Sequence, residues 1–191
     1  MASVSTNEFK SGMKVEMDKE PYTIISVDFV KPGKGQAFTR TKLRHLTSGR
    51  VVEKTFKSGE KLDIADVEET KMRLLYGEGD SYIFMNDDSF DQVEIPAEVI
   101  GQNKNYMIDD TVYELTFYKG NAVDVVPPTF LTMTIVETAP GARGDTASGR
   151  VLKPAVTNTG ASISIPIFIE EGELIKVDTR TGEYVSRVKD S

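Results

Sequence analysis

Cysteine is absent from this chain of 191 residues, and histidine occurs once, at His45. Without cysteine there are no disulfides, no thiolate ligands for a metal and no cysteine nucleophile. A single histidine excludes a metal site built from several imidazoles. No apolar run approaches the roughly 18 residues of a membrane-spanning helix, and the N-terminal segment lacks the apolar core of a signal peptide. We therefore expect a soluble, cytoplasmic protein that does not bind membranes and holds no metal.

Acidic residues are missing from one region, although the formal net charge of the chain is −7. Residues 1–64 carry a net charge of +4, residues 65–127 of −10 and residues 128–191 of −1. No acid occurs between Asp28 and Glu53. That interval holds six basic residues: Lys31, Lys34, Arg40, Lys42, Arg44 and Arg50. This pattern predicts contact with a polyanion, with a solvated strand face as the alternative.

Strand patterns dominate the chain. Short segments rich in β-branched and aromatic residues recur at intervals of about 8–12 residues, separated by glycine, proline, aspartate and asparagine. We predict an all-β protein built from small barrels or sandwiches. The composition turns from basic to acidic near residue 64, and Pro127 and Pro128 interrupt strand pairing. These changes predict three domains, at 1–64, 65–127 and 128–191.

Helix patterns are few. Residues 96–108 form the best candidate, which would start after Pro96 and end or break near Gly101. Residues 63–72 are compatible with one helical turn, although a connection between two domains is the favoured interpretation.

Lys34 occupies a segment typical of a hairpin turn, "VKPGKGQ". Pro32 suits the second position of a type II turn, Gly33 would supply the positive φ that its third position needs, and Gly35 adds flexibility. Lys34 should therefore lie at an exposed apex. A solvated lysine suits a cationic probe or the target of a modifying enzyme, although the turn taken alone favours a glycine-rich hairpin in which the lysine has no special role. Use as a covalent nucleophile would require a desolvated or electrostatically altered amine.

Two long motifs resemble the bacterial elongation factor P family. The first is "FVKPGKGQAF", with the basic segment that follows it. The second lies at 153–173 and fits the family signature K-x-A-x4-G-x2-[LIV]-x-V-P-x2-[LIV]-x2-G, except that Ile165 replaces valine. The residues that fit are Lys153, Ala155, Gly160, Ile163, Pro166, Ile169 and Gly172. "IKVDTRTGEYVSRV" also matches, so the resemblance covers essentially the whole chain.

The resemblance implies an SH3-like (KOW) domain followed by two OB-type barrels in an L-shaped, tRNA-like arrangement. It implies a non-enzymatic factor that binds the 70S ribosome beside a P-site peptidyl- or initiator tRNA and relieves stalling at consecutive prolines. We expect a monomer, because the partner would be the ribosome and the sequence shows no stripe for self-association. The family has no catalytic residue or cofactor of its own. In its lysine-tipped branch, a lysyl-tRNA-synthetase-like enzyme attaches a β-lysyl group to the position of Lys34, sometimes with hydroxylation.

Contacts with tRNA or rRNA are expected from the hairpin: Lys31, Pro32, Gly33, Gly35, Arg40, Lys42 and Arg44. By resemblance, the Gly144-Asp145-Thr146 loop would approach the E-site mRNA codon; as a motif by itself it is weak. Tyr184 and Arg187 are further candidates for RNA contact, although a regular strand would place them on opposite faces, and Tyr184 is equally compatible with a core position. His45 is expected to be structural or an RNA neighbour. The acidic segment 86–94 lacks the Ca²⁺-loop pattern and is predicted to be a solvated turn.

Two other functions stay open. An enzyme with Lys34 as nucleophile would need a pocket that the turn does not offer. A paralogue of elongation factor P, or an RNA-binding module with another ribosomal client, would share the basic hairpin, but the match at both ends of the chain favours elongation factor P itself.

Overall fold

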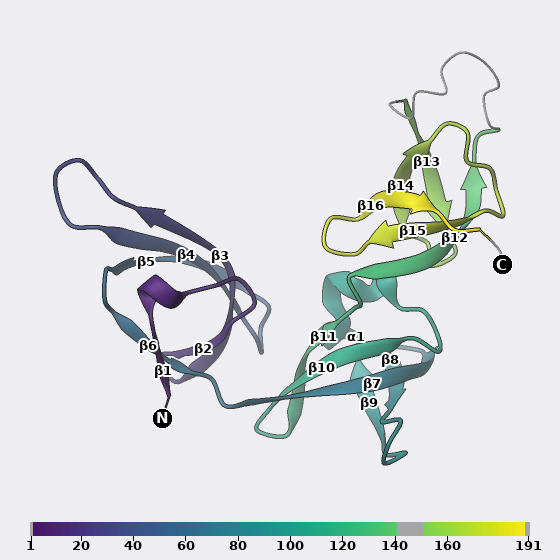
Figure 1. Cartoon of the computed structure of the whole chain (residues 1–191). Helices are drawn as coiled ribbons and strands as arrows, with labels where there is room; N and C mark the ends of the chain where they lie inside the picture. Colours follow the sequence, from purple (N-terminus) through teal and green to yellow (C-terminus); the bar gives the residue numbers. More distant parts are fainter. Residues whose placement is uncertain (1, 141–150, 190–191) are drawn as a thin grey trace. The chain divides into compact units, whose positions relative to one another are not determined.

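The computed structural model describes residues 2–140 and 151–189, and most of these residues lie in β-strands. In the described residues the strands form three sheets (Figure 1). The prediction of an all-β protein is confirmed. Among the same residues, no helix is long and apolar enough to cross a membrane.

The first sheet has six strands in the order β1-β6-β2-β3-β4-β5. Its elements are β1 (Ser3–Ser5), the 3₁₀ helix η1 (Thr6–Glu8), β2 (Lys14–Met17), β3 (Glu20–Val30), β4 (Phe38–His45), β5 (Val51–Lys57) and β6 (Lys61–Ile64). The core beneath this sheet contains the fully buried Val15, Ile24 and Leu43. Phe9 meets Phe56 edge to face in the same core, with ring centroids 5.6 Å apart. Burial of these apolar side chains is what stabilises so small a unit.

The second sheet has five strands in the order β11-β10-β7-β8-β9. Its elements are β7 (Val67–Glu78), β8 (Ser81–Met85), β9 (Gln92–Pro96), the helix α1 (Ala97–Ile100), the 3₁₀ helix η2 (Gly101–Tyr106), β10 (Val112–Tyr118) and β11 (Asn121–Val126). Phe84 and Tyr113 are buried and meet edge to face at 5.8 Å. The Tyr113 hydroxyl accepts from the Ile108 amide at 2.9 Å and donates to the Tyr106 carbonyl at 2.5 Å.

The third sheet has five strands in the order β14-β13-β12-β15-β16. They are β12 (Phe130–Thr138), β13 (Leu152–Thr157), β14 (Ser162–Pro166), β15 (Leu174–Asp178) and β16 (Glu183–Arg187). Every second residue of β12 up to Ile135 is buried, at Leu131, Met133 and Ile135, as the two-residue period of a strand over a core requires. Two residues of the C-terminal signature, Ile165 and Ile169, are fully buried in this core.

The two expected domain joints fall where strands end. β6 ends at Ile64 and β7 begins at Val67, while β11 ends at Val126 and β12 begins at Phe130. By its internal contacts the chain groups into two compact units. The first contains the residues up to Glu69 together with Thr116–Asp124, and the second contains Thr70–Leu115 and the residues from Val125 onward. The three-domain division therefore stays a prediction.

The helical expectations have different outcomes. Residues 96–108 contain α1 and η2, and the break falls at Gly101, which has a φ of 55°. A helical turn within residues 63–72 does not form, because β7 begins at Val67. The alternation of burial in β7, where Met72 and Leu74 are buried and their neighbours are more exposed, shows why a strand forms there.

Candidate nucleic-acid interface

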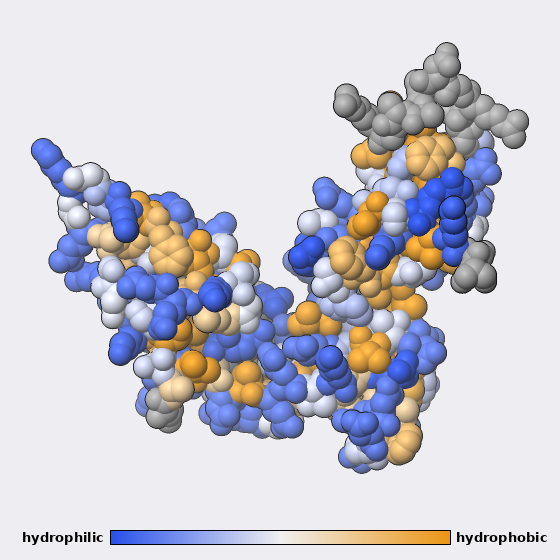
Figure 2. All heavy atoms as spheres, in the orientation of Figure 1, coloured by the Kyte–Doolittle hydropathy of each residue, from blue (hydrophilic) through white to orange (hydrophobic). Residues whose placement is uncertain are grey.

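The hairpin of β3 and β4 carries the loop that contains Lys34 (Figure 1). Val30 pairs with Phe38, so the connection consists of residues 31–37. Residues 31–36 are all exposed, and Lys34 lies at the centre of a bend. The end of this hairpin presents a hydrophilic surface (Figure 2). Lys34 thus stands at an exposed apex, where its ammonium group can reach a partner.

The two glycines beside Lys34 have different roles from those that the sequence predicts. Gly35 has a φ of 116°, whereas Gly33 is not among the glycines with positive φ. A type II turn needs positive φ at its third position, so the prediction of such a turn at Pro32 and Gly33 is wrong. The chain reverses direction over the whole of residues 31–37 and needs its left-handed residue after Lys34.

Strand β4 separates its basic residues from the core. Thr39, Thr41 and Leu43 are buried, while the intervening Arg40 and Lys42 are exposed. Arg44 continues the basic row but is half-buried. The two-residue period of the strand produces this alternation, so Arg40, Lys42 and Arg44 share one face, as their spacing indicates.

The segment that carries the basic residues contains no acid, but the two neighbouring strands place carboxylates beside its basic face. Arg40 lies opposite Asp28 of β3, and Lys42 lies opposite Glu53 of β5. Arg40 Nε also approaches Glu53 Oε1 to 3.7 Å, and both side chains are about half exposed. Such an exposed pair is weak and easily exchanged for a phosphate. The face is therefore less positive than the segment between Asp28 and Glu53 suggests.

Arg44 has a different environment from the other basic residues of the hairpin. Its Nη2 donates to Asp124 Oδ2 at 2.9 Å. The side chain of Asp124 is 7% exposed and that of Arg44 is 38% exposed. Asp124 lies in β11, 80 residues along the chain from Arg44. Binding of Arg44 to RNA would have to compete with this partly buried ion pair.

Three lysines of the hairpin are open to solvent. Lys31, Lys34 and Lys42 are exposed, and within residues 2–140 and 151–189 none of them forms an ion pair within 4.0 Å. Phe29 was missed by the sequence analysis. It lies on β3 opposite Thr39, near the start of the loop, and the residue is 54% exposed. The signal was an aromatic residue directly before a basic turn, a combination that suits stacking on nucleic-acid bases.

His45 has structural partners, as one of its two expected roles requires. Its Nδ1 lies 2.7 Å from Ser48 Oγ, its Nε2 lies 3.1 Å from Glu20 Oε2, and its ring meets Tyr22 edge to face at 5.0 Å. These contacts tie the end of β4 to the start of β3.

The predicted site residues of the third sheet are only partly described. Gly144, Asp145 and Thr146 lie outside the described residues. Tyr184 pairs with Val177 and Arg187 pairs with Ile175, because a register shift leaves Val185 as an extra residue in β16. Both therefore stand opposite core residues of β15, and the expectation of opposite faces is wrong.

Arg187 and Tyr184 both contact other residues associated with the third sheet. Arg187 binds Glu173 Oε1 and lies over the ring of Phe168, 5.6 Å from its centroid. Burial acts to raise the pKa of Glu173, but the Glu170 amide and Arg187 hold that pKa below its usual range. Tyr184 packs against the third core, and burial raises the pKa of its phenol. RNA contacts through these two residues stay a prediction.

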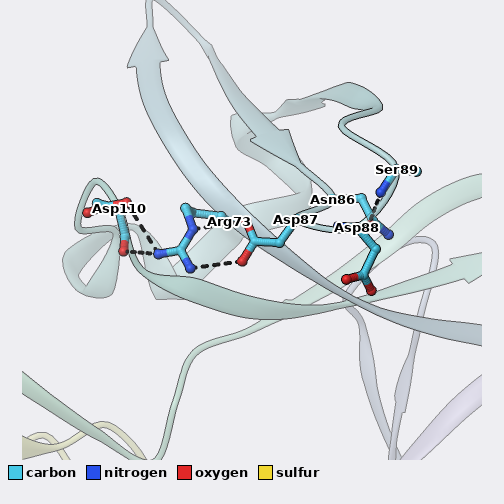
Figure 3. Close-up of polar contacts among 6 residues, drawn as sticks. All are labelled: Arg73, Asn86, Asp87, Asp88, Ser89 and Asp110. Atoms are coloured by element: carbon cyan, nitrogen blue, oxygen red, sulfur yellow. Dashed lines mark hydrogen bonds and ion pairs between the residues drawn. The ribbon is translucent and has the colours of Figure 1, made fainter.

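Most of the acidic segment 86–94 is an ordered turn (Figure 3), and its last three residues, 92–94, begin β9. Asn86 Oδ1 accepts from the amides of Asp88 and Ser89 at 2.8 and 3.1 Å. Arg73 of β7 binds Asp87 from this turn and also Asp110. In the described part of the chain, no group of three or more acidic or histidine side chains is arranged to hold a metal ion. The arrangement fits the predicted solvated turn.

Three family models together match most of the chain. The elongation factor P KOW-like domain matches residues 5–62, the elongation factor P OB domain matches residues 67–125, and the elongation factor P C-terminal domain matches residues 131–187.

Proteins of similar sequence match this chain over nearly its full length. "Elongation factor P 2" of Protochlamydia amoebophila is 62% identical over 188 residues, which cover 98% of this chain and 99% of that protein. "Elongation factor P 2" of Chlamydia caviae is 56% identical with the same coverage. A solved structure titled eukaryotic translation initiation factor 5A from Methanococcus jannaschii has a TM-score of 0.48 and 21% identity, and covers 65% of this chain and 96% of that one.

Proposed function

The chain belongs to the elongation factor P family of translation factors, and we propose that it binds the ribosome beside the P-site tRNA and promotes peptide-bond formation at consecutive prolines. In this proposal the hairpin of β3 and β4 extends along the tRNA towards its CCA end. The ribosome carries out the chemistry. The protein acts by positioning the tRNA and supplies no catalytic residue.

The observation that carries this proposal is the exposure of Lys34 at the end of a long hairpin. An exposed lysine between two glycines has no side chains beside it that would block close approach to RNA. It lacks the buried pocket that would make it a nucleophile. These features support a cationic probe over an enzyme.

The basic residues of the hairpin supply the attraction to RNA. Each phosphate that Lys31, Arg40 or Lys42 neutralises releases counterions, so binding should weaken as salt rises. Pro32, Gly33 and Gly35 would let the loop backbone approach the acceptor end closely. Arg44 is not among these proposed contacts, because Asp124 engages its guanidinium.

A covalent β-lysyl group on Lys34 would extend this reach. In the proposed modification, an enzyme resembling lysyl-tRNA synthetase would use ATP to convert the carboxyl group of β-lysine to an acyl adenylate, with release of pyrophosphate. Lys34 Nζ, after losing a proton, would then attack the acyl carbon and displace AMP to form an amide bond. The Lys34 amine loses its charge, and the added group brings two amines. The longer, more cationic side chain would contact the CCA end more firmly.

Positioning has a large effect on a reaction with a poor substrate. Proline is rigid, and two prolines reach attack geometry rarely. Well-oriented reactants can gain about 7–11 kcal/mol relative to free ones, so even a small part of this gain relieves a stall. Further contacts to the E-site mRNA through Gly144, Asp145 and Thr146, and to RNA through Tyr184 and Arg187, belong to the same proposal.

The test is synthesis of a peptide with three consecutive prolines in a reconstituted system. Protein from its own host is compared with Lys34→Ala, and with Lys71→Ala as a control for the loss of one exposed lysine outside the hairpin. The proposal requires that the native protein and Lys71→Ala relieve the stall and that Lys34→Ala does not. If all three bind ribosomes and none affects prolines, the protein serves another ribosomal client.

A further inference from the structure

We propose that Arg44 and Asp124 form a clamp that sets the direction of the Lys34 hairpin, with Arg44 acting as a positioning residue. This inference rests on the proposed function, since the direction of the hairpin matters only if Lys34 must reach a defined target. It assigns to Arg44 a role different from the RNA contact that its charge suggests.

The contact itself argues against a free cation. Arg44 Nη2 donates to Asp124 Oδ2 at 2.9 Å, and the Asp124 residue is 5% exposed. If Arg44 turned towards a phosphate, the Asp124 carboxylate would stay buried without its partner. Leaving a buried charge uncompensated is strongly unfavourable. The pair is therefore expected to persist when the protein binds RNA.

The position of the pair makes it a clamp. Arg44 lies near the end of β4, at the base of the hairpin and far from its loop. Asp124 lies in β11 and belongs to the same compact unit, as part of Thr116–Asp124. The neighbours of Arg44 across the sheet, Thr23 and Val51, carry no charge and cannot replace Asp124.

A small rotation at the base has a large effect at the tip. Arg44 and Phe38 are the ends of a stretch of β4 that spans roughly 20 Å at about 3.3 Å per residue, and the loop lies beyond Phe38. A rotation of about 10° at Arg44 would move the end of such a strand by roughly 3 Å. Misplacement of a reacting group by about 1 Å can lower a rate by about 100-fold. A factor that acts by positioning its hairpin tip therefore needs the base of that hairpin to be held in one orientation.

The same strand offers a matched control. Arg40 faces Glu53 at 3.7 Å, and the two side chains are 51% and 52% exposed. Both pairs join an arginine of β4 to a carboxylate of another strand, but that of Arg44 is shorter and partly buried. Glu53→Gln and Asp124→Asn each remove one negative charge and leave the arginine in place.

The experiment measures synthesis across three prolines over a range of factor concentrations, for the native protein, Lys34→Ala, Asp124→Asn and Glu53→Gln. If Arg44 contacted RNA, Asp124→Asn would free it and tighten binding. The clamp predicts instead that Asp124→Asn lowers the rate at saturating factor by about tenfold, with less than about a twofold change in the half-saturating concentration. Glu53→Gln should keep the native rate.

A cross-linked variant separates the clamp from a general loss of folding. The chain has no cysteine, so Arg44→Cys with Asp124→Cys introduces one pair of thiols. A short bismaleimide that joins them should raise the saturating rate severalfold over that of the unjoined variant, with the melting temperature of each sample recorded alongside. Both samples share one sequence and one preparation, so the comparison holds even if the variant is less stable.

The outcomes distinguish the two proposals. A native protein that behaves like Lys34→Ala overturns the proposed function. If the native protein relieves the stall, the clamp is overturned by an Asp124→Asn variant with the native saturating rate, or by a folded cysteine variant whose rate does not respond to cross-linking.

Discussion

Arg73 holds Asp87 through two parallel hydrogen bonds, with Nε donating to Oδ1 at 3.0 Å and Nη2 donating to Oδ2 at 2.8 Å. The same guanidinium donates through Nη1 to the carbonyl of Asp110 at 2.8 Å. One side chain of β7 thereby joins the turn after β8 to the turn before β10 (Figure 3). A bidentate pair of this kind is more specific in geometry than an ordinary surface ion pair.

This pair predicts a dependence of stability on pH. The hydrogen bond from Arg73 lowers the pKa of Asp87 below its ordinary value of 3.8. A carboxyl group with a lowered folded-state pKa stabilises the protein above its unfolded-state pKa, and this stabilisation is lost as pH falls through the folded-state value. At pH 7, Asp87→Asn should lower the melting temperature by about 1–3 °C, because the pair is exposed.

The measurement is thermal unfolding of the native protein and Asp87→Asn at pH 7 and over a series of lower pH values, where the difference should shrink as the pH falls through the folded-state pKa of Asp87. Asp88→Asn is the control, since Asp88 is an exposed carboxylate of the same turn. An Asp87→Asn deficit that is as large in acid as at neutral pH would contradict an ionic contribution.

Alanine substitution should have different effects at the two glycines of the loop. Gly35→Ala forces a side chain onto a residue with a φ of 116°, which should cost about 1–3 kcal/mol or shift the backbone beside Lys34. Gly33 is not among the positive-φ residues, and a Cβ built there meets no atom within 4 Å. We expect Gly35→Ala to reduce stall relief more than Gly33→Ala does. Equal activities at equal ribosome occupancy would show that the loop conformation does not matter.

These residues also show how far the sequence predicts the site. Alternation along β4 correctly separates the basic residues from the core, because a strand has a fixed two-residue period. Proline and glycine correctly predict a turn, yet they do not decide between Gly33 and Gly35, since loop length and strand register set that choice. The partner of Arg44 lies 80 residues away, and the bulge at Val185 depends on pairing with β15. Both are properties of tertiary structure that local patterns do not contain.

Removal of the Tyr113 hydroxyl should destabilise the core of the second sheet. The hydroxyl pairs with the amide of Ile108 and the carbonyl of Tyr106, and the residue is 1% exposed. Tyr113→Phe would leave both backbone groups without that partner, which should lower the free energy of unfolding by about 1–3 kcal/mol. Urea unfolding measures this change. Tyr118→Phe, at a half-buried position of the same strand, should have less than about half that effect.

Substitution by valine should affect the stability of the protein differently at two buried threonines. Thr41 is fully buried, and its Oγ1 has no hydrogen-bond partner among the residues that the structure describes. Thr6 is equally buried, but its Oγ1 donates to the Lys57 carbonyl at 3.3 Å and accepts from the Gly59 amide at 3.2 Å. Desolvating a hydroxyl without a compensating hydrogen bond is unfavourable, and replacing it by a methyl group removes that cost.

Thr41→Val should therefore leave the free energy of unfolding unchanged or raise it by up to about 1 kcal/mol, while Thr6→Val should lower it by about 1–2 kcal/mol. The shapes of the side chains are nearly the same, so the hydroxyl accounts for the difference. Urea unfolding of both variants under one set of conditions decides the matter. A loss of stability in Thr41→Val as large as that in Thr6→Val would mean that the Thr41 hydroxyl has a partner in solution, such as a bound water, that holds β4 in place beneath its basic face.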